Sequence, residues 1–316
     1  MAHAQAFKLA LLQFAIGLDP AENLRKAQAS AEAAIKSGAQ VLCLPELFRT
    51  PYFCQREDAP LFDLAETIPG PTTEAFSEIC RQHNVAAIVP VFERRAPGLY
   101  HNSAAVIDAG GALLGVYRKM HIPDDPGYYE KYYFTPGDLG FRVFETRFGK
   151  VGVLICWDQW FPEAARLAAL QGATVLCYPT AIGWNPKDRR SMAALEQLDA
   201  WRTIQRAHAI ANGVYVAAVN RFGLESPLAG GLARLHQLGT PAPAQPANPE
   251  EGLLFWGSSF IADPFGAILE EGPDDAPVNL LAVIDPRRME EVRRNWPFLR
   301  DRRIDAYAGL NERYRD

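Results

Sequence analysis

Long apolar runs and an excess of positive charge are both missing from this chain of 316 residues. No window approaches the roughly 20 consecutive apolar residues of a membrane-spanning helix, and the first residues lack the apolar run of a secretory signal. The 32 basic residues face 37 acidic ones, which disfavours a nucleic acid or an anionic membrane as partner. We therefore expect a cytoplasmic protein that binds neither.

The usual motifs of cofactor sites are also missing. The five cysteines are odd in number and widely spaced, and no C-x-x-C pair occurs, which disfavours a disulfide framework or a structural zinc site. Neither G-x-G-x-x-G after an expected strand nor G-x-x-x-x-G-K-[ST] is found, which disfavours a dehydrogenase or a phosphate-binding loop. The chemistry expected below needs no metal and no cofactor.

An internal repeat is the strongest signal that is present. Residues 38–45 read G-A-Q-V-L-C-L-P and residues 172–179 read G-A-T-V-L-C-Y-P, so six of eight positions match at an offset of 134. Two further pairs of segments align in the same order along the chain: 8–12 with 150–154, and 103–114 with 258–269. Ordered matches of this kind indicate two related halves.

Each half is expected to contain the same succession of elements. Asp19 as N-cap, Pro20 and Gly38 predict a helix over 20–36, and Pro162 and Gly172 predict one over 162–170. Two further helices are expected near 72–82 and 190–211. The expected strands are 7–14, 41–45, 86–93, 103–107 and 112–117 in the first half, and 151–156, 175–179, 214–220, 258–262, 267–270 and 280–284 in the second.

This succession predicts an α/β fold with two mixed sheets, each covered by helices on one face and by the other sheet on its second face. The expected architecture is a four-layer α-β-β-α sandwich with internal pseudo-twofold symmetry. We treat residues 1–316 as a single domain with a core of about 7–285 and a C-terminal extension of about 286–316. A proline- and alanine-rich insertion at 239–251 is expected to be an exposed loop, and its role is left open.

Two strand ends carry reactive side chains. Cys156 is expected to leave a buried strand near free backbone N–H groups, and Glu46 leaves the buried strand of the other half. Pseudo-symmetry brings these strand ends together, so that a nucleophile and a base meet. Cys43, Cys80 and Cys177 fit a purely structural role in apolar segments. Cys54 is also expected in the core, with a pocket wall as the alternative.

Three motifs resemble the catalytic motifs of the nitrilase superfamily of carbon–nitrogen hydrolases. They are L-P-E-L-F at Glu46, Y-R-K-M-H-I-P at Lys119 and I-C-W-D-Q-W-F-P-E at Cys156. The resemblance runs from about residue 8 to residue 303. The longer strings T-P-Y-F-C-Q, D-D-P-G-Y-Y-E-K-Y-Y-F-T-P-G-D and Y-P-T-A-I-G are similar to its N-carbamoylputrescine amidase branch. The resemblance implies a nitrilase-like fold and hydrolysis through a cysteine thioester.

The resemblance assigns a role to each residue of these motifs. Cys156 is the nucleophile, and Glu46 is the base that its thiol needs at neutral pH. Lys119 and the backbone N–H of Trp157 are the expected donors to the oxyanion. Glu130 resembles a second glutamate that holds the lysine, and its alternative is a solvated loop carboxylate. His121 fits a structural histidine better than a partner of the cysteine.

The expected substrate is a small ureido or amide compound with a cationic tail. Relatives that hydrolyse carbamoyl amino acids place arginine just after the cysteine, and this chain has W-D-Q-W there. The candidate substrate-binding residues are Tyr52, Asp125, Trp184 and Asn185. The last two stand where close relatives have a small residue and an acid, so the amine that is recognised can differ.

Several alternatives stay open at this point. The preferred activity converts N-carbamoylputrescine to putrescine, CO2 and ammonia, as in polyamine biosynthesis. Another amidase of the superfamily, acting on an N-carbamoyl amino acid or an aliphatic amide, is the first alternative. The second is a binding module that has lost turnover. The resemblance also implies a homo-oligomer, a dimer or larger.

Overall fold

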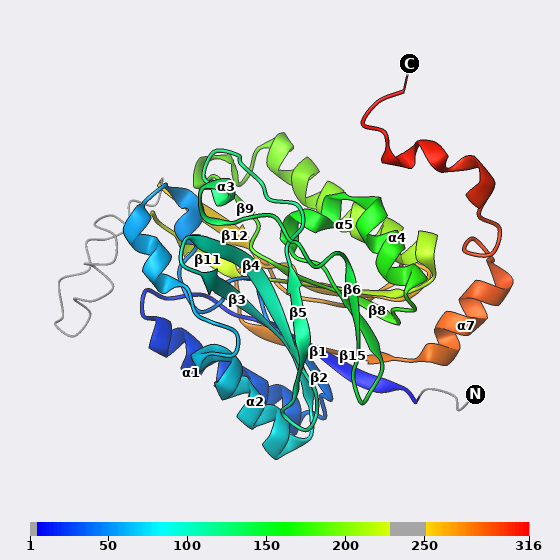
Figure 1. Cartoon of the computed structure of the whole chain (residues 1–316), viewed down its shortest axis with the longest axis horizontal. Coiled ribbons are helices and arrows are strands. Elements are labelled where there is room, and N and C mark those ends of the chain that lie inside the picture. The colour runs from blue at the N-terminus through cyan, green and yellow to red at the C-terminus, as the bar shows by residue number, and fades with distance from the viewer. Residues whose placement is uncertain (1–4, 228–250, 316) are drawn as a thin grey trace.

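Two six-stranded sheets form the centre of the molecule in the computed structural model, which describes residues 5–227 and 251–315 (Figure 1). In sheet order, the first contains β15 (Val278–Ile284), β1 (Phe7–Gln13), β2 (Val41–Cys43), β3 (Ala86–Ala96), β4 (Leu99–Ile107) and β5 (Leu113–Arg118). The second contains β14 (Ile268–Glu271), β13 (Phe260–Ala262), β10 (Tyr215–Asn220), β8 (Val175–Thr180), β7 (Lys150–Val153) and β6 (Arg142–Glu145). Strands β1 and β10 contact each other across the two sheets.

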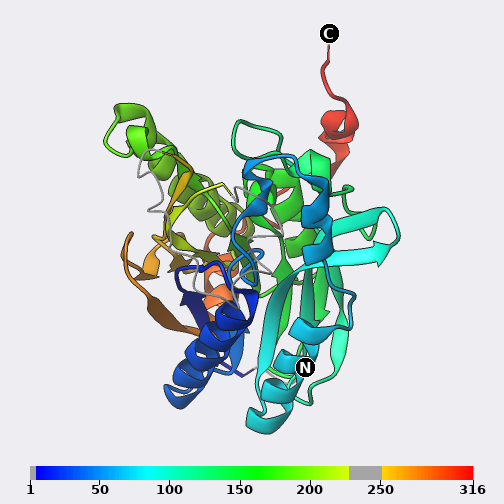
Figure 2. The ribbon, with the colours of Figure 1, turned by 90° about the vertical axis from the view of Figure 1, so that its left-hand side faces the viewer.

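Helices cover the outer face of each sheet. Helices α1 (Pro20–Lys36) and α2 (Pro71–His83) pack on the first sheet, and α4 (Pro162–Leu170) and α5 (Met192–Asn212) pack on the second. They lie on opposite sides of the molecule (Figures 1 and 2). The faces between the layers are apolar because each sheet is covered by the other sheet on one side and by helices on the other, which excludes solvent. The four-layer α-β-β-α sandwich predicted from the repeat is confirmed.

Local capping explains why two helices have their predicted bounds. The Asp19 side chain accepts from Ala21 N–H at 2.8 Å at the start of α1. Gly38 and Gly172 follow the two helices with φ of 96° and 92°, a left-handed conformation that glycine adopts without strain. The predicted bounds of α1 and α4 are confirmed.

The last strand joins the opposite sheet from the one predicted. The segment 280–284 was assigned to the second half, but β15 pairs antiparallel with β1 of the first sheet, with Phe7 opposite Ile284. The missing place in the second sheet is filled by β6, which precedes β7 and was not predicted. The sequence of a short apolar strand does not specify which sheet it joins at an edge, so either sheet could accept this strand.

The strand predicted over 151–156 is shorter than expected. Strand β7 ends at Val153, and Cys156 instead opens a five-residue 3-10 helix, Cys156–Trp160. Cys156 has φ of 44°, a left-handed value that is uncommon for a residue other than glycine. The chain therefore turns sharply at this cysteine.

A small third sheet and several short elements were not predicted. The sheet contains β11 (Phe222–Glu225), β12 (Leu253–Trp256) and β9 (Gly183–Trp184). A single helical turn, α3 (Glu130–Tyr133), carries Glu130. Helix α7 (Pro286–Asn295) begins the C-terminal extension, which runs outward along one side of the molecule (Figure 1).

Two expectations have a limited counterpart in the structure. Among the residues it describes, none of the helices combines the length and the apolar character that a membrane crossing requires. The insertion predicted at 239–251 lies, apart from Glu251, outside the described residues.

Candidate active site

Glu46 lies buried just beyond the end of β2, where the chain leaves the first sheet. Its Oε1 accepts from Lys119 Nζ at 2.8 Å and from Asn102 Nδ2 at 2.6 Å. Its Oε2 is buried and has no hydrogen-bond partner among the described residues. Asn102 was missed by sequence reasoning, although it stands in a short polar run, residues 101–103, that enters the apolar part of strand β4 and could have drawn attention to it.

Lys119 is clamped between two carboxylates. Its Nζ donates to Glu46 and, at 2.7 Å, to Glu130 Oε2, and all three side chains are fully buried. Burial alone would lower the pKa of Lys119, but the charges of Glu130 and Glu46 outweigh it and raise the pKa well above its usual value. The lysine therefore stays an ammonium, and the third N–H of its Nζ has no partner among the residues described.

Glu130 is not the solvated loop carboxylate that was its alternative. Its Oε1 accepts from the Tyr52 hydroxyl at 2.7 Å, opposite the contact of its Oε2 with Lys119. Burial, opposed by the charge of Lys119 and reinforced by that of Glu46, raises the pKa of Glu130 to about 7. Glu130 therefore holds its proton to a higher pH than an exposed carboxyl group does.

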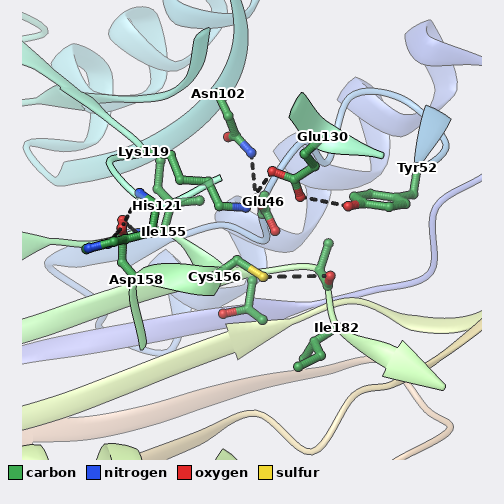
Figure 3. Close-up of polar contacts among 12 residues, drawn as sticks. Glu46, Tyr52, Asn102, Lys119, His121, Glu130, Ile155, Cys156, Asp158 and Ile182 are labelled. Atoms are coloured by element: carbon green, nitrogen blue, oxygen red, sulfur yellow. Dashed lines mark hydrogen bonds and ion pairs between the residues drawn. The ribbon is translucent and has the colours of Figure 1, made fainter. Parts of the chain in front are cut away.

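Cys156 faces this cluster from the second half of the chain. Figure 3 shows its sulfur directed toward the space between Glu46 and Ile182, with Sγ 3.8 Å from the carbonyl oxygen of Ala181. Burial raises the pKa of the Cys156 thiol, the charge of Glu46 raises it further, and Lys119 lowers it. The backbone N–H groups expected to favour a thiolate do not outweigh burial, so the thiol needs a proton acceptor to react.

Asp158 fixes the turn at Cys156 and was missed by sequence reasoning. Its Oδ2 accepts from Ile155 N–H at 2.9 Å and from the Tyr117 hydroxyl at 2.6 Å. Its Oδ1 accepts from the backbone N–H of His121 at 3.0 Å and lies 2.7 Å from His121 Nδ1 (Figure 3). The spacing C-x-D at the start of a helix, where a carboxylate commonly caps, is the signal that could have identified it.

His121 takes the structural position that the sequence favoured. Its ring stacks on Phe161, with centroids 3.7 Å apart and planes 5° apart, while Nδ1 is engaged by Asp158. The ring is therefore held beside the turn, and the hydrogen bonds of Cys156 among the described residues do not include it.

A cavity of about 750 Å³ opens beside Cys156. Besides Cys156, four of the predicted site residues contribute to its lining: Trp157, Asp125, Trp184 and Asn185. Asp188 lines it as well and was not predicted. Among the four candidate substrate-binding residues, Tyr52 is the one that does not line this cavity: it is fully buried and donates to Glu130. Its contact with substrate stays a prediction, and its hydroxyl also gives it a role in holding Glu130.

The remaining cysteines lie in the core. Cys43, Cys80 and Cys177 are buried among apolar side chains, as predicted. Cys54 is also fully buried and does not line the cavity, so the pocket-wall alternative is not supported. Within residues 5–227 and 251–315, no group of three or more His, Cys, Asp or Glu side chains has an arrangement suited to a metal ion.

A thiol, a carboxylate with a free oxygen and a buried ammonium form an arrangement suited to nucleophilic attack on a carbonyl group. The family model described as carbon-nitrogen hydrolase matches residues 8–294. A crystal structure of a carbon–nitrogen hydrolase from Helicobacter pylori G27 superposes with a TM-score of 0.89 at 44% identity, covering 98% of this chain and 100% of that one. The chain belongs to the carbon–nitrogen hydrolase family and is an amidohydrolase.

Two curated relatives carry more specific names. The N-carbamoylputrescine amidase of Solanum lycopersicum is 43% identical over 303 residues, which cover 96% of this chain and 94% of the relative. The citrullinase of Francisella tularensis is 39% identical over 308 residues, covering 97% of this chain and 99% of the relative. Both names describe enzymes that act on compounds with a ureido group. The resemblance to the N-carbamoylputrescine amidase branch that was read from the motifs is confirmed.

Proposed function

We propose that Cys156, Glu46 and Lys119 hydrolyse a ureido compound through a carbamoyl thioester. Cys156 Sγ attacks the carbonyl carbon while the thiol proton passes to the free oxygen of Glu46. The third N–H of Lys119 and the backbone N–H of Trp157 receive the oxyanion. Glu130 keeps the lysine in place. The observation that carries this proposal is the buried, unpartnered Oε2 of Glu46 beside the thiol.

The remaining steps return the enzyme to its starting state. The carbon–nitrogen bond breaks, and the proton held by Glu46 goes to the departing nitrogen. Water then attacks the thioester, Glu46 takes a proton from that water and passes it to the sulfur, and the carbon–sulfur bond breaks to regenerate the thiol. The carbamic acid released in this step then breaks its remaining carbon–nitrogen bond to give CO2 and the second amine or ammonia. The balance is R–NH–CO–NH2 + H2O → R–NH2 + CO2 + NH3, whichever nitrogen leaves first.

The proposed substrate is N-carbamoylputrescine, with putrescine as the amine product. The carboxylates of Asp125 and Asp188 are exposed in the cavity wall, and no Lys or Arg lies among its described lining residues. Two carboxylates and no cation among the described lining residues favour a cationic tail over the carboxylate of an amino acid. Citrulline is the second candidate, supported by the citrullinase relative.

A panel of substrates separates these candidates. Release of ammonia is measured with N-carbamoylputrescine, citrulline, N-carbamoyl-β-alanine, an aliphatic amide and a nitrile. N-carbamoylputrescine is expected to give the highest kcat/KM. A higher value for N-carbamoyl-β-alanine or citrulline overturns the cationic tail, and no release from any compound supports a binding module without turnover.

Matched charge variants test the proposed role of the acids. Asp188→Asn and Asp125→Asn are each expected to lower kcat/KM for N-carbamoylputrescine roughly two- to fivefold, because exposed ion pairs contribute up to about 1 kcal/mol. Asp124→Asn is the control, since Asp124 is exposed next to Asp125 but does not line the cavity. Equal effects of all three changes would show that Asp125 and Asp188 do not recognise the substrate.

We also propose that the chain is one domain that acts in the cytoplasm as a homo-oligomer. Support for assembly comes from large apolar side chains that are exposed on α4, α5 and the C-terminal extension, among them Leu170, Met192 and Tyr314. Light scattering on the purified protein tests the proposed assembly, and a monomer at micromolar concentration overturns it.

A further inference from the structure

Arg221 is a fully buried cation behind the active site, immediately after β10. Its Nη2 donates to the backbone carbonyl oxygen of Glu46 at 2.5 Å. Its Nη1 lies 3.0 and 3.1 Å from the two carboxylate oxygens of Glu225, and the guanidinium lies over the ring of Phe255 at 5.3 Å. An arginine of the second half of the chain therefore binds the turn that carries Glu46 in the first half.

Glu225 links the same arginine to the other side of the site. Its Oε2 accepts from Tyr52 N–H at 2.7 Å, and the Tyr52 hydroxyl donates to Glu130. The backbone oxygen of Glu225 also accepts from Gln55 Nε2 at 2.9 Å. The ion pair thus contacts the turn that carries Glu46 directly and reaches Glu130 through Tyr52.

The turn after Glu46 needs such a support. Leu47 has φ of 48°, a left-handed value that costs a residue other than glycine of order 1–3 kcal/mol and persists only where the surroundings impose it. The Glu46 carbonyl oxygen belongs to the peptide that enters this residue, and Arg221 is its charged donor. Burying an ion pair contributes little to stability by itself, so its placement on this turn suggests a different role.

Neither member of the pair lines the cavity beside Cys156. We propose that Arg221, held by Glu225, is a positioning residue that sets the location of the Glu46 carboxylate and, through Tyr52, of Glu130. The inference rests on the proposed function, because it assumes that Glu46 is the base. It places a determinant of the reaction rate in a region that substrate does not reach.

Two conservative variants test this role. Arg221→Lys keeps a cation opposite Glu225, but one ammonium cannot reproduce the guanidinium contacts to both Glu225 and Glu46. Glu225→Gln keeps the shape and removes the charge that orients the arginine. Each is expected to lower kcat for N-carbamoylputrescine by up to about 100-fold, the effect of displacing a reacting group by about 1 Å, while KM stays within about twofold.

A second measurement needs no substrate. Iodoacetamide alkylation of Cys156 is followed by mass spectrometry between pH 6 and pH 10. In both variants alkylation is expected to be slower near neutral pH, where Glu46 must take the thiol proton, and to approach the wild-type rate at high pH, where hydroxide does so. A variant that is merely less stable would not show slower alkylation near neutral pH together with a wild-type rate at high pH.

The control is Asp263→Asn. Asp263 lies on the β13–β14 turn, and the change breaks its ion pair with Arg288 of α7 and leaves the active site untouched. It is expected to change stability without changing kcat or the alkylation profile. Wild-type kcat and alkylation in both folded variants would overturn the positioning role, as would loss of the folded state in both. Absence of wild-type turnover would instead refute the proposed function, and alkylation would still report on Arg221.

Discussion

Leu47 and Cys156, one in each half of the chain, share a left-handed backbone conformation, with φ of 48° and 44°. Each turn is held by a buried charged side chain on a backbone group next to it. Arg221 binds the carbonyl oxygen of Glu46, and Asp158 binds the N–H of Ile155. The two strained turns present the proposed base and nucleophile to each other, which is a way to hold reacting groups in a fixed geometry.

Removal of the proposed nucleophile or base should abolish turnover without unfolding the protein. Cys156→Ala is expected to have no measurable ammonia release, and Glu46→Gln to lose about 10²- to 10⁴-fold in kcat, the usual contribution of a positioned acid or base. Cys80→Ala on α2 is the control for cysteine removal, and it should keep the wild-type rate. Activity that survives in Cys156→Ala would refute the thioester route.

Loss of the buried cation should cost stability as well as activity. Lys119→Met leaves Glu46 and Glu130 buried without their shared ammonium, and breaking a buried pair in this way typically costs about 3–5 kcal/mol. The double variant with Glu130→Gln removes one carboxylate and should recover part of that loss in urea unfolding, while remaining inactive. Equal stability of the single and double variants would contradict this charge balance.

Stability should depend on pH through Glu130. Its folded-state pKa of about 7 lies above the usual value of 4.5, so between these pH values the folded state keeps a proton that the unfolded state has lost. The contribution of Glu130 to the free energy of unfolding therefore falls as pH rises from about 4.5 to about 7, with a slope of at most about 1.4 kcal/mol per pH unit.

Glu130→Gln removes this titration and tests it. The difference in Tm between the variant and the wild type should move in favour of the variant from pH 5 to pH 8. Buried His101 and His208 have lowered pKa values, chiefly through burial, and also make stability depend on pH. They are common to both proteins, so their effect cancels in the difference. A Tm difference that is independent of pH would contradict the raised pKa.

Variants of His121 and Asp158 should show whether His121 has a structural role or acts with Cys156 as a Cys/His pair. His121→Asn is expected to lower kcat less than tenfold, because the ring is stacked on Phe161 and bonded to Asp158. Asp158→Asn removes the charge at the turn of Cys156 and should cost about 100-fold in kcat and about 1–3 kcal/mol in stability. An effect of His121→Asn as large as that of Glu46→Gln would restore the Cys/His alternative.

Local signals made part of the fold predictable. A proline, a capping aspartate and one glycine after the last turn marked both ends of α1, and apolar runs marked the strands of both sheets. The sheet that receives β15 was not predictable, because its apolar strand matches either edge. The strands of the small third sheet have two to four residues, which is too short to show a period.

The candidate site followed from strand ends and motifs, but its supports did not. Glu46, Lys119, Glu130 and Cys156 stand in contexts that predicted their convergence, and the structure brings them together. Their catalytic roles stay predictions. Arg221 and Glu225 lie in N-R-F-G-L-E, which has the polar appearance of an exposed turn, and only folding shows that both are buried.

The pairing of β15 with β1 has a consequence for synthesis of the chain. Strand β1 leaves the ribosome long before its antiparallel neighbour β15, which ends at Ile284, so one edge of the first sheet stays open until residues 278–284 have emerged. Open apolar edges are sites of aggregation. Nascent chains stalled before residue 278 should therefore associate with chaperones through residues 7–13, and release of the final strand should end that association.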